Sequence, residues 1–142
     1  MLSDDMKQFK EKIREVTILD EHGLPLLAGE HDRRFFEASW MHKYKGKYYF
    51  SYSTGDTHFI CYAIGESPYG PFIYQGRILN PVVGWTTHHS ICSYKGNWYL
   101  FYHDSSLSEG VTHLRSVKLT ELSYDENGKI HLIEPYRENI LN

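Results

Sequence analysis

A glutamate in an apolar setting is the side chain of this sequence best suited to acid–base chemistry. Glu37 lies in the run FFEASW (35–40), among two phenylalanines, an alanine and a tryptophan. Poor solvation disfavours the charged form of a carboxyl, and a carboxyl that keeps its proton near neutral pH is what a general acid requires. The alternative is a glutamate at the start of a strand that is solvated or paired with Arg33 or Arg34.

Two adjacent histidines form the second candidate. His88 and His89 lie in GWTTHHS (84–90), where a strand is expected to begin. Successive side chains of a strand point to opposite faces. One imidazole can therefore face a ligand while the other packs, and the two cannot bind one metal ion from a regular strand. The other histidines show no zinc spacing such as HExxH.

An arginine and a loop tryptophan are the remaining candidates for ligand contact. Arg115 interrupts a strand-like stretch, LRSV (114–117). A buried arginine must find a carboxylate or a hydroxyl-rich ligand; the alternative is an arginine at the rim or edge of the fold. Trp85 lies in an expected loop, which makes it the better tryptophan for stacking on a sugar, whereas Trp98 falls on an apolar strand face and is expected in the core.

An internal repeat indicates the elements that position these residues. YKGKYYFSY (44–52) matches YKGNWYLFY (94–102) at an offset of fifty residues. Repeats of about 40–50 residues with four short strands each are typical of β-propeller blades. The sequence therefore predicts an all-β fold with two four-stranded blades, and a sandwich with two similar hairpins is the alternative. The repeat aligns Ala38, not Glu37, with His88, so the two candidates are not in strict phase.

The expected organisation has three parts. Residues 1–34 form a leader, the end of a preceding blade, with a short helix at 4–15 and a loop; residues 35–80 form one blade and residues 81–142 the final one. A closed propeller needs roughly 4–8 blades, and blade faces without neighbours need covering. We therefore expect the chain to associate with missing N-terminal blades or with other copies of itself, as a homo-oligomer.

Composition argues against several classes of protein. Fifteen Lys+Arg stand against eighteen Asp+Glu, a formal net charge of -3, which argues against a nucleic-acid partner. No apolar run reaches the ~18 residues of a membrane span, so no membrane partner is expected. The charged residues 1–14 lack the apolar core of a signal peptide, which favours a cytoplasmic protein unless a leader lies outside this chain.

Several motifs in the same order resemble glycoside hydrolase family 43, in particular its β-xylosidases and α-L-arabinofuranosidases. They are FFEASWMHKYKGKYYFSYSTG, SPYGPFIYQGRIL, GWTTHHSI, NWYLFYHD, and LRSVKLTEL followed by DENGKI. The resemblance covers roughly residues 4–135. It implies a five-bladed propeller with its active site in the central channel, of which this chain would be the C-terminal part. It also implies an inverting glycosidase acting on xylose- or arabinose-containing oligosaccharides of plant hemicellulose.

The resemblance also implies roles for single residues. Glu37 matches the general acid, and Arg115 matches an arginine that contacts substrate or the catalytic carboxylates. His88 matches the channel histidine, which in many members neighbours a structural calcium ion bound largely through water. Because calcium prefers oxygen ligands, His88 is better explained as a hydrogen-bonding partner, and as a substrate contact with Arg115 and Trp85, than as part of an all-histidine cage. No cofactor is required for the chemistry itself.

One departure from the family pattern limits what this chain is expected to do alone. Family members also use two aspartates, one as base and one that tunes and orients the acid, and these belong to blades that precede this chain. Inverting hydrolysis needs a base about 6.5–9.5 Å from the acid. The isolated chain is therefore expected to be inactive. The alternative is a non-catalytic carbohydrate-binding or assembly module derived from such an enzyme.

Overall fold

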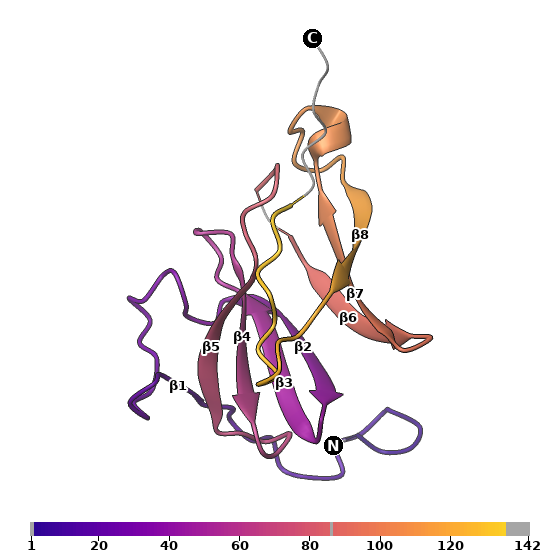
Figure 1. The fold of residues 1–142 in the computed structure, drawn as a ribbon. Coiled ribbons are helices and arrows are strands. Elements are labelled where there is room, and N and C mark those ends of the chain that lie inside the picture. The colour runs from indigo at the N-terminus through magenta and orange to yellow at the C-terminus, as the bar shows by residue number, and fades with distance from the viewer. Residues whose placement is uncertain (1, 86, 136–142) are drawn as a thin grey trace.

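Two β-sheets that pack face to face make up the computed structural model, which describes residues 2–85 and 87–135 (Figure 1). Their strands pair antiparallel except for the short edge strand β1, which runs parallel to β5. The first sheet has the strand order β1-β5-β4-β3-β2 and the second has the order β6-β7-β8. The elements are β1 (Ile18–Leu19), β2 (Glu37–Tyr44), β3 (Lys47–Ser53), β4 (Ile60–Gly65), β5 (Phe72–Leu79), β6 (His89–Tyr94), β7 (Asn97–Asp104), the 3-10 turn η1 (Ser106–Ser108) and β8 (Ser116–Leu122). Within the described residues, no helix is long and apolar enough to cross a membrane.

The two copies of the repeat fold into hairpins with the same turn. Lys45 and Gly46 have φ angles of 45° and 85°, and Lys95 and Gly96 have φ angles of 49° and 85°. Two successive residues with positive φ are the mark of the two-residue turn whose twist matches that of paired strands. The β2–β3 and β6–β7 hairpins therefore repeat one another, as the sequence predicted, and the all-β prediction is confirmed.

The main core fills the space between the sheets because each sheet turns one apolar face toward the other. Leu100 and Tyr102 of β7 are 0% and 4% exposed, and Trp98 on the same face packs against them, as expected. From the first sheet, Tyr49 and Tyr62 pack onto this core. The opposite face of the first sheet carries a smaller cluster that includes Tyr52. Burial of these side chains is the main term that stabilises the fold.

The second sheet departs from the predicted four strands. Its described part has three, and the segment expected as the fourth, residues 129–134, returns to the first sheet instead (Figure 1). Ile133 pairs with Leu79 in parallel, and the backbone N–H of Ile130 donates to the Tyr62 hydroxyl at 2.9 Å. This course buries Ile130, which is 6% exposed and belongs to the core between the two sheets. The segment thus seals the core rather than extending a sheet.

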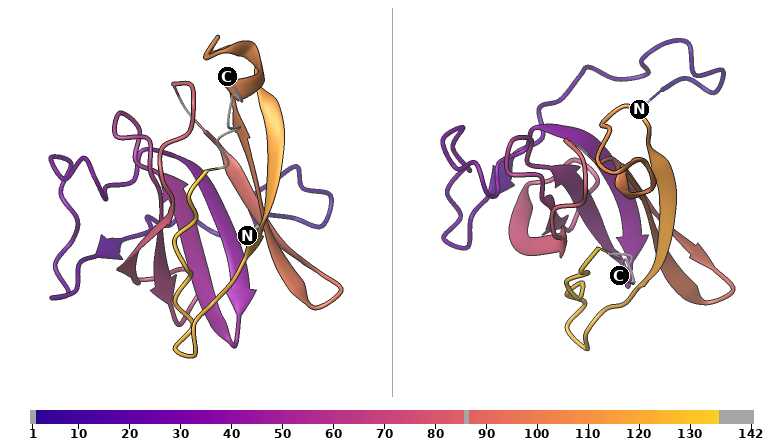
Figure 2. Two further views of the ribbon diagram at one scale, coloured as in Figure 1. Left: turned by 45° about the horizontal axis from the view of Figure 1, so that its top comes forward. Right: turned by 90° about the horizontal axis from the view of Figure 1, so that it is seen from above.

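The predicted helix at residues 4–15 is wrong. This segment forms bends and a small loop closed by a bridge between Leu2 and Phe9, and it runs along the outside of the sheets (Figure 2). Phe9 and Ile13, two of the residues spaced for an apolar helical face, are 67% and 80% exposed. A helix this short is marginal in water unless its apolar face packs, and here that face has no partner among the described residues.

Candidate functional site

A β-bulge places Glu37 opposite the second sheet. Glu37 pairs with Ser53 and Trp40 pairs with Ser51, so two residues of β2 stand against one residue of β3. Ala38, within the bulge, has a φ of 58°. An extra residue shifts the phase of a strand by one and turns its side chains to the other face. The bulge therefore gives Glu37 the position that His88 holds in the second copy, which resolves the mismatch in the repeat.

Glu37 and His88 meet where the two sheets adjoin. Glu37 Oε1 lies 3.5 Å from His88 Nε2, with the two side chains 36% and 52% exposed. Neither proposed alternative partner of Glu37 is used, because Arg33 pairs with glutamates of the leader and Arg34 pairs with Asp56. The Glu37 carboxyl is therefore partly exposed to solvent, and it also faces the His88 imidazole of the neighbouring sheet.

His103 holds the backbone of His88 in place. The His88 N–H donates to His103 Nε2 at 3.0 Å, so the proton of a neutral His103 ring is on Nδ1. Thr87, 1% exposed, adds two bonds: its hydroxyl donates to the His103 carbonyl at 2.7 Å and accepts from the His103 N–H at 3.3 Å. Burial, followed by the charges of Arg115 and His88, lowers the pKa of His103 and so favours the neutral ring.

His89 points away from its neighbour, as adjacent strand positions require. Its Nε2 lies 2.7 Å from the Ser51 hydroxyl of β3. Burial lowers its pKa to about 3, so the ring is neutral near pH 7. The expected difference between the two neighbours is observed, since His88 is half-exposed beside Glu37 while His89 packs against β3 and ties the two sheets together. That His88 faces a ligand stays a prediction.

Arg115 is a rim arginine and not a buried one. It is exposed, and its Nε donates to the Thr112 carbonyl at 2.9 Å, within the connection from β7 to β8. After burial, the positive charge of Arg115 is the next cause that lowers the pKa of His103. Of the two interpretations of Arg115, the arginine at the rim of the fold is the one observed, and the buried arginine is not. The role of Arg115 as a substrate contact stays a prediction.

The tryptophans have separate roles. Trp85 is 63% exposed in the connection from β5 to β6, and its ring meets the ring of His58 edge-on at 5.0 Å. Trp40, 36% exposed, donates from its indole N–H to the Ile91 carbonyl of β6 at 3.1 Å and so joins β2 to the second sheet. Trp85 is thus the tryptophan that offers a free ring face near the site.

The acidic residues that could accompany Glu37 are engaged elsewhere. The aspartates that precede it each take part in a local turn or ion pair: Asp4 with Lys10, Asp5 with the Lys7 N–H, Asp20 with the N–H groups of residues 22 and 24, and Asp32 with Arg77. In the part of the chain that the structure describes, no three His, Cys, Asp or Glu side chains form a group that could hold a metal ion. The site can donate or accept one proton at Glu37, beside an imidazole.

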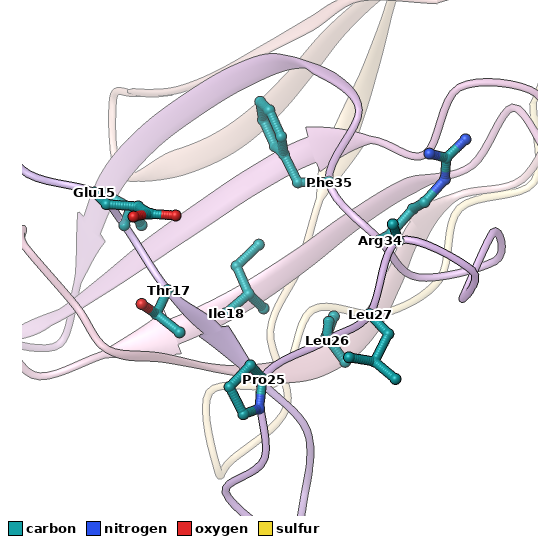
Figure 3. A pocket seen from close by; sticks show the side chains of 10 residues that line it. Glu15, Thr17, Ile18, Pro25, Leu26, Leu27, Arg34 and Phe35 are labelled. Carbon is teal, nitrogen blue, oxygen red and sulfur yellow. The ribbon is translucent and has the colours of Figure 1, made fainter.

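A hollow of about 320 Å³ lies apart from this pair, on the face of the first sheet turned away from the second (Figure 3). It is lined by the leader at residues 15–18 and 25–28 together with Arg34 and Phe35. Phe35, Leu26 and Ile18 point apolar surface into it (Figure 3). The lining is part apolar and part charged, with Glu15 and Arg34 among its residues, and it does not include Glu37 or His88. The hollow is therefore separate from the Glu37–His88 pair.

Known proteins match almost the whole chain, although no family model does. A xylosidase/arabinosidase from Bacteroides ovatus is 68% identical over 133 residues, and xylosidase/arabinosidase 43A from Humicola insolens is 66% identical over 135 residues. The crystal structure of a GH43 β-xylosidase/α-arabinofuranosidase from a compost microbial metagenome, in complex with xylotriose, is 64% identical and has a TM-score of 0.93 over 96% of this chain. The chain belongs to glycoside hydrolase family 43.

As a family 43 chain it is partial. It spans 41% of the length of the two curated relatives and 42% of the compost enzyme. A GH43_1 enzyme from Xanthomonas citri, complexed with xylotriose, gives the same result, with a TM-score of 0.93 at 61% identity over 42% of its length. The resemblance and the all-β propeller class are confirmed, whereas the number of blades in the closed ring and the division at residues 34 and 80 stay predictions.

The residues around His88 do not make a calcium cage. Calcium takes six to eight oxygen ligands, and the groups gathered here are the Glu37 carboxyl, the two imidazoles of His88 and His103, and backbone amides. The two rings lie 6.0 Å apart, and one is already bonded to the backbone of the other. The donor set therefore does not fit direct coordination of calcium by these residues.

Proposed function

We propose that this chain carries the general-acid half of a family 43 glycosidase site that acts on xylose- or arabinose-containing oligosaccharides. The observation that supports it is the contact of Glu37 with His88 across the two sheets, 3.5 Å apart. Glu37 donates a proton to the leaving glycosidic oxygen, and His88 orients the carboxyl. Arg115 and Trp85 contact the sugar from the neighbouring loops. The relatives named xylosidase/arabinosidase support the substrate class.

The base is supplied from outside residues 1–142. In an inverting mechanism a second carboxylate activates water from the far side of the sugar, about 6.5–9.5 Å from the acid. The aspartates before Glu37 are occupied in the leader, so neither the base nor the second aspartate comes from them. The remaining length of the relatives, well over half of each chain, is the natural source of both.

Exposed apolar side chains on the second sheet and a partly apolar hollow beside the first support association with such a part. The outer face of the second sheet exposes Val117 and Leu119, which are 76% and 57% exposed, and the hollow beside Phe35 lies on the far face of the first sheet. Faces of this kind attract a partner. The partner we expect is the remaining part of the propeller, with further copies of this chain as the alternative.

Without the remaining part of the propeller, the chain is expected to associate with itself. Sedimentation at roughly tens of micromolar should then show a dimer or a larger species, and a clean monomer would contradict this.

The catalytic proposal is tested by complementation. The full chain is mixed with the polypeptide that corresponds to the rest of the Humicola insolens relative, and hydrolysis of aryl β-xylosides and aryl α-arabinofuranosides is measured. We expect negligible turnover by the chain alone, turnover by the mixture, and a loss of about 10²–10⁴-fold with Glu37→Gln. Glu66→Gln, at an exposed glutamate paired with Lys47, is the matched control. Turnover by the chain alone that Glu37→Gln abolishes would show that the base lies within it.

A carbohydrate-binding module without catalysis is the second candidate, and the observation that favours it is the exposed ring of Trp85. Calorimetric titration of the chain with xylo- and arabino-oligosaccharides distinguishes the two. Binding that is lost with Trp85→Ala, combined with no hydrolysis in any mixture and no effect of Glu37→Gln, would support the module over the enzyme.

A further inference from the structure

The connection from β7 to β8, residues 105–115, folds into a compact loop at one end of the second sheet (Figure 1). The loop is bonded within itself, because the Ser105 carbonyl accepts from the Gly110 N–H at 2.8 Å. Arg115 is the last residue before β8, and its Nε donates to the Thr112 carbonyl of the same loop at 2.9 Å. The position of the guanidinium therefore depends on how this loop is held.

One buried carboxylate joins the two ends of the loop. Asp104 is the last residue of β7, and its side chain is 1% exposed. At the start of the loop, Asp104 Oδ1 accepts from the Ser106 N–H at 3.1 Å and from the Ser106 hydroxyl at 2.9 Å. At the end of the loop, the same oxygen accepts from the Ser116 hydroxyl at 3.3 Å. The carboxylate thus closes the loop by bonding both of its ends.

The burial of Asp104 is unusual for a charged side chain. Among the residues that the structure describes as buried, Asp104 is the only charged one. A buried charge is costly unless hydrogen bonds and an opposite charge compensate for it. Here the two serines supply the hydrogen bonds, and Lys118 Nζ lies 3.8 Å from Oδ1. Because a carboxylate accepts hydrogen bonds more strongly than a neutral group does, the charge holds the loop more tightly than a neutral side chain would.

The loop closure lies directly beside the residues that support His88. Asp104 follows His103 in the sequence and pairs with Ser116 in the β7–β8 register, so Arg115 is the first residue beyond that pair. Burial and then the positive charge of Arg115 lower the pKa of His103. The His103 ring in turn accepts the His88 N–H at 3.0 Å. A shift of the loop would therefore move the guanidinium relative to both histidines.

We propose that Asp104 is a positioning residue of the candidate site, which fixes the β7–β8 connection and so holds the Arg115 guanidinium beside His103. It acts through the two serines that it bonds and touches no substrate itself. The value of this position for a sugar rests on the proposed function, in which Arg115 contacts the sugar. The fixing of Arg115 does not depend on that function, and it can be measured in the chain alone.

The order of Arg115 in the full chain is the first test. Nitrogen-15 relaxation reports the order parameter of its Nε–H, and mass spectrometry reports the exchange rates of the loop amides. Asp104→Ala is expected to lower the order parameter to below about 0.6, and to raise the exchange rates on the order of tenfold. Asp104→Asn keeps an oxygen that accepts hydrogen bonds and should restore most of the order.

A matched control separates this effect from a general loss of stability. Asp125→Ala removes a carboxylate that closes another turn, where it accepts from the Lys129 N–H at 2.8 Å. It should leave the order of Arg115 unchanged, and an equal effect of Asp125→Ala and Asp104→Ala would overturn the proposal. So would an unchanged order of Arg115 in Asp104→Ala. If that variant does not fold, Ser116→Ala decides, because it keeps the carboxylate and removes only the bond to the end of the loop.

Kinetics of the complemented enzyme distinguish this inference from the proposed function. Asp104→Ala and Arg115→Ala are expected to raise KM for aryl β-xylosides by similar factors, on the order of tenfold, with a smaller change in kcat. The double variant should be no worse than Arg115→Ala, because Asp104 acts through Arg115. Additive losses would show that Asp104 acts by another route and would overturn the inference. Absence of turnover in every mixture contradicts the proposed function, and the order of Arg115 then decides the positioning role by itself.

Discussion

Acidification should weaken the contact between the two sheets through two histidines that lie partly buried between them as neutral rings. His42 of β2 lies between the rings of Tyr49 and Trp98, at 4.9 Å and 5.2 Å, and its Nε2 is 2.8 Å from the Tyr124 hydroxyl. His89 of β6 bonds Ser51. Burial lowers the pKa of His42 to about 4 and that of His89 to about 3, from the ordinary value of 6.5. Both rings therefore resist protonation only while the sheets are packed.

The direction and size of the effect follow from proton binding. Since both values of the pKa are lowered by folding, the unfolded chain binds more protons than the folded chain below pH 6.5. Stability is then fully present above that pH and is lost as the pH falls toward 4 and 3. Each histidine contributes about 1.4 kcal/mol per pH unit in this window, so a change from about pH 7.5 to about pH 5 costs about 2 kcal/mol for each ring. Together they lose about 4 kcal/mol, a large share of an ordinary stability of about 5–15 kcal/mol.

Urea unfolding followed by tryptophan fluorescence measures this loss directly, at several pH values between about 7.5 and 5. His89→Gln removes one titrating ring and keeps a polar group that can reach Ser51. It is expected to lower the free energy of unfolding at pH 7.5 and to reduce its fall on acidification by about 2 kcal/mol. His22→Gln, at a side chain that is 76% exposed, is the control and should leave the pH dependence unchanged. An equally steep loss in the wild-type chain and His89→Gln would refute the reasoning.

Two further substitutions test how the site is supported. Gly55→Ala should destabilise the chain by about 2 kcal/mol, because φ is 83° there and the new Cβ would lie 2.7 Å from the ring of Phe36. Gly46→Ala is the control, since Gly46 has a similar φ but open space around it, and it should cost about half as much. Equal losses of stability in thermal unfolding would contradict the steric argument. Trp40→Phe should cost about 1 kcal/mol in urea unfolding, because it removes the indole donor to the Ile91 carbonyl, and an unchanged midpoint would show that this bond does not hold the sheets together.

The hairpins of the fold could be predicted because their signals are local. Two positive φ angles at Lys45–Gly46 and again at Lys95–Gly96 are what a Gly-containing two-residue turn between alternating apolar residues requires. The prediction of a helix at 4–15 was wrong for the opposite reason. The spacing of its apolar residues does not indicate whether another part of the fold is present for that face to pack against. The course of residues 129–134 also could not be predicted, because a strand-like composition does not say which sheet it joins.

The candidate site was predictable in its residue types but not in its connections. Glu37, His88 and Trp85 stood out by chemistry and by place in the sequence, and the structure brings the first two into contact. His103 was missed, although it supports His88 through its ring nitrogen and its backbone. The only signal in the sequence was its position one residue beyond the end of the repeated motif, opposite His88.

The extra residue at Ala38 has a consequence for engineering. A consensus blade could be designed from an alignment of the two copies at the fixed offset of fifty residues. That alignment would pair Ala38 with His88 and Glu37 with Thr87. The averaged protein would keep its hairpins and its core, and it would lose the carboxyl that contacts His88 of the other sheet. Repeats of this kind therefore have to be aligned by the strand residues that pair with each other. An alignment by residue number alone places the reactive carboxyl opposite the wrong residue of the second copy.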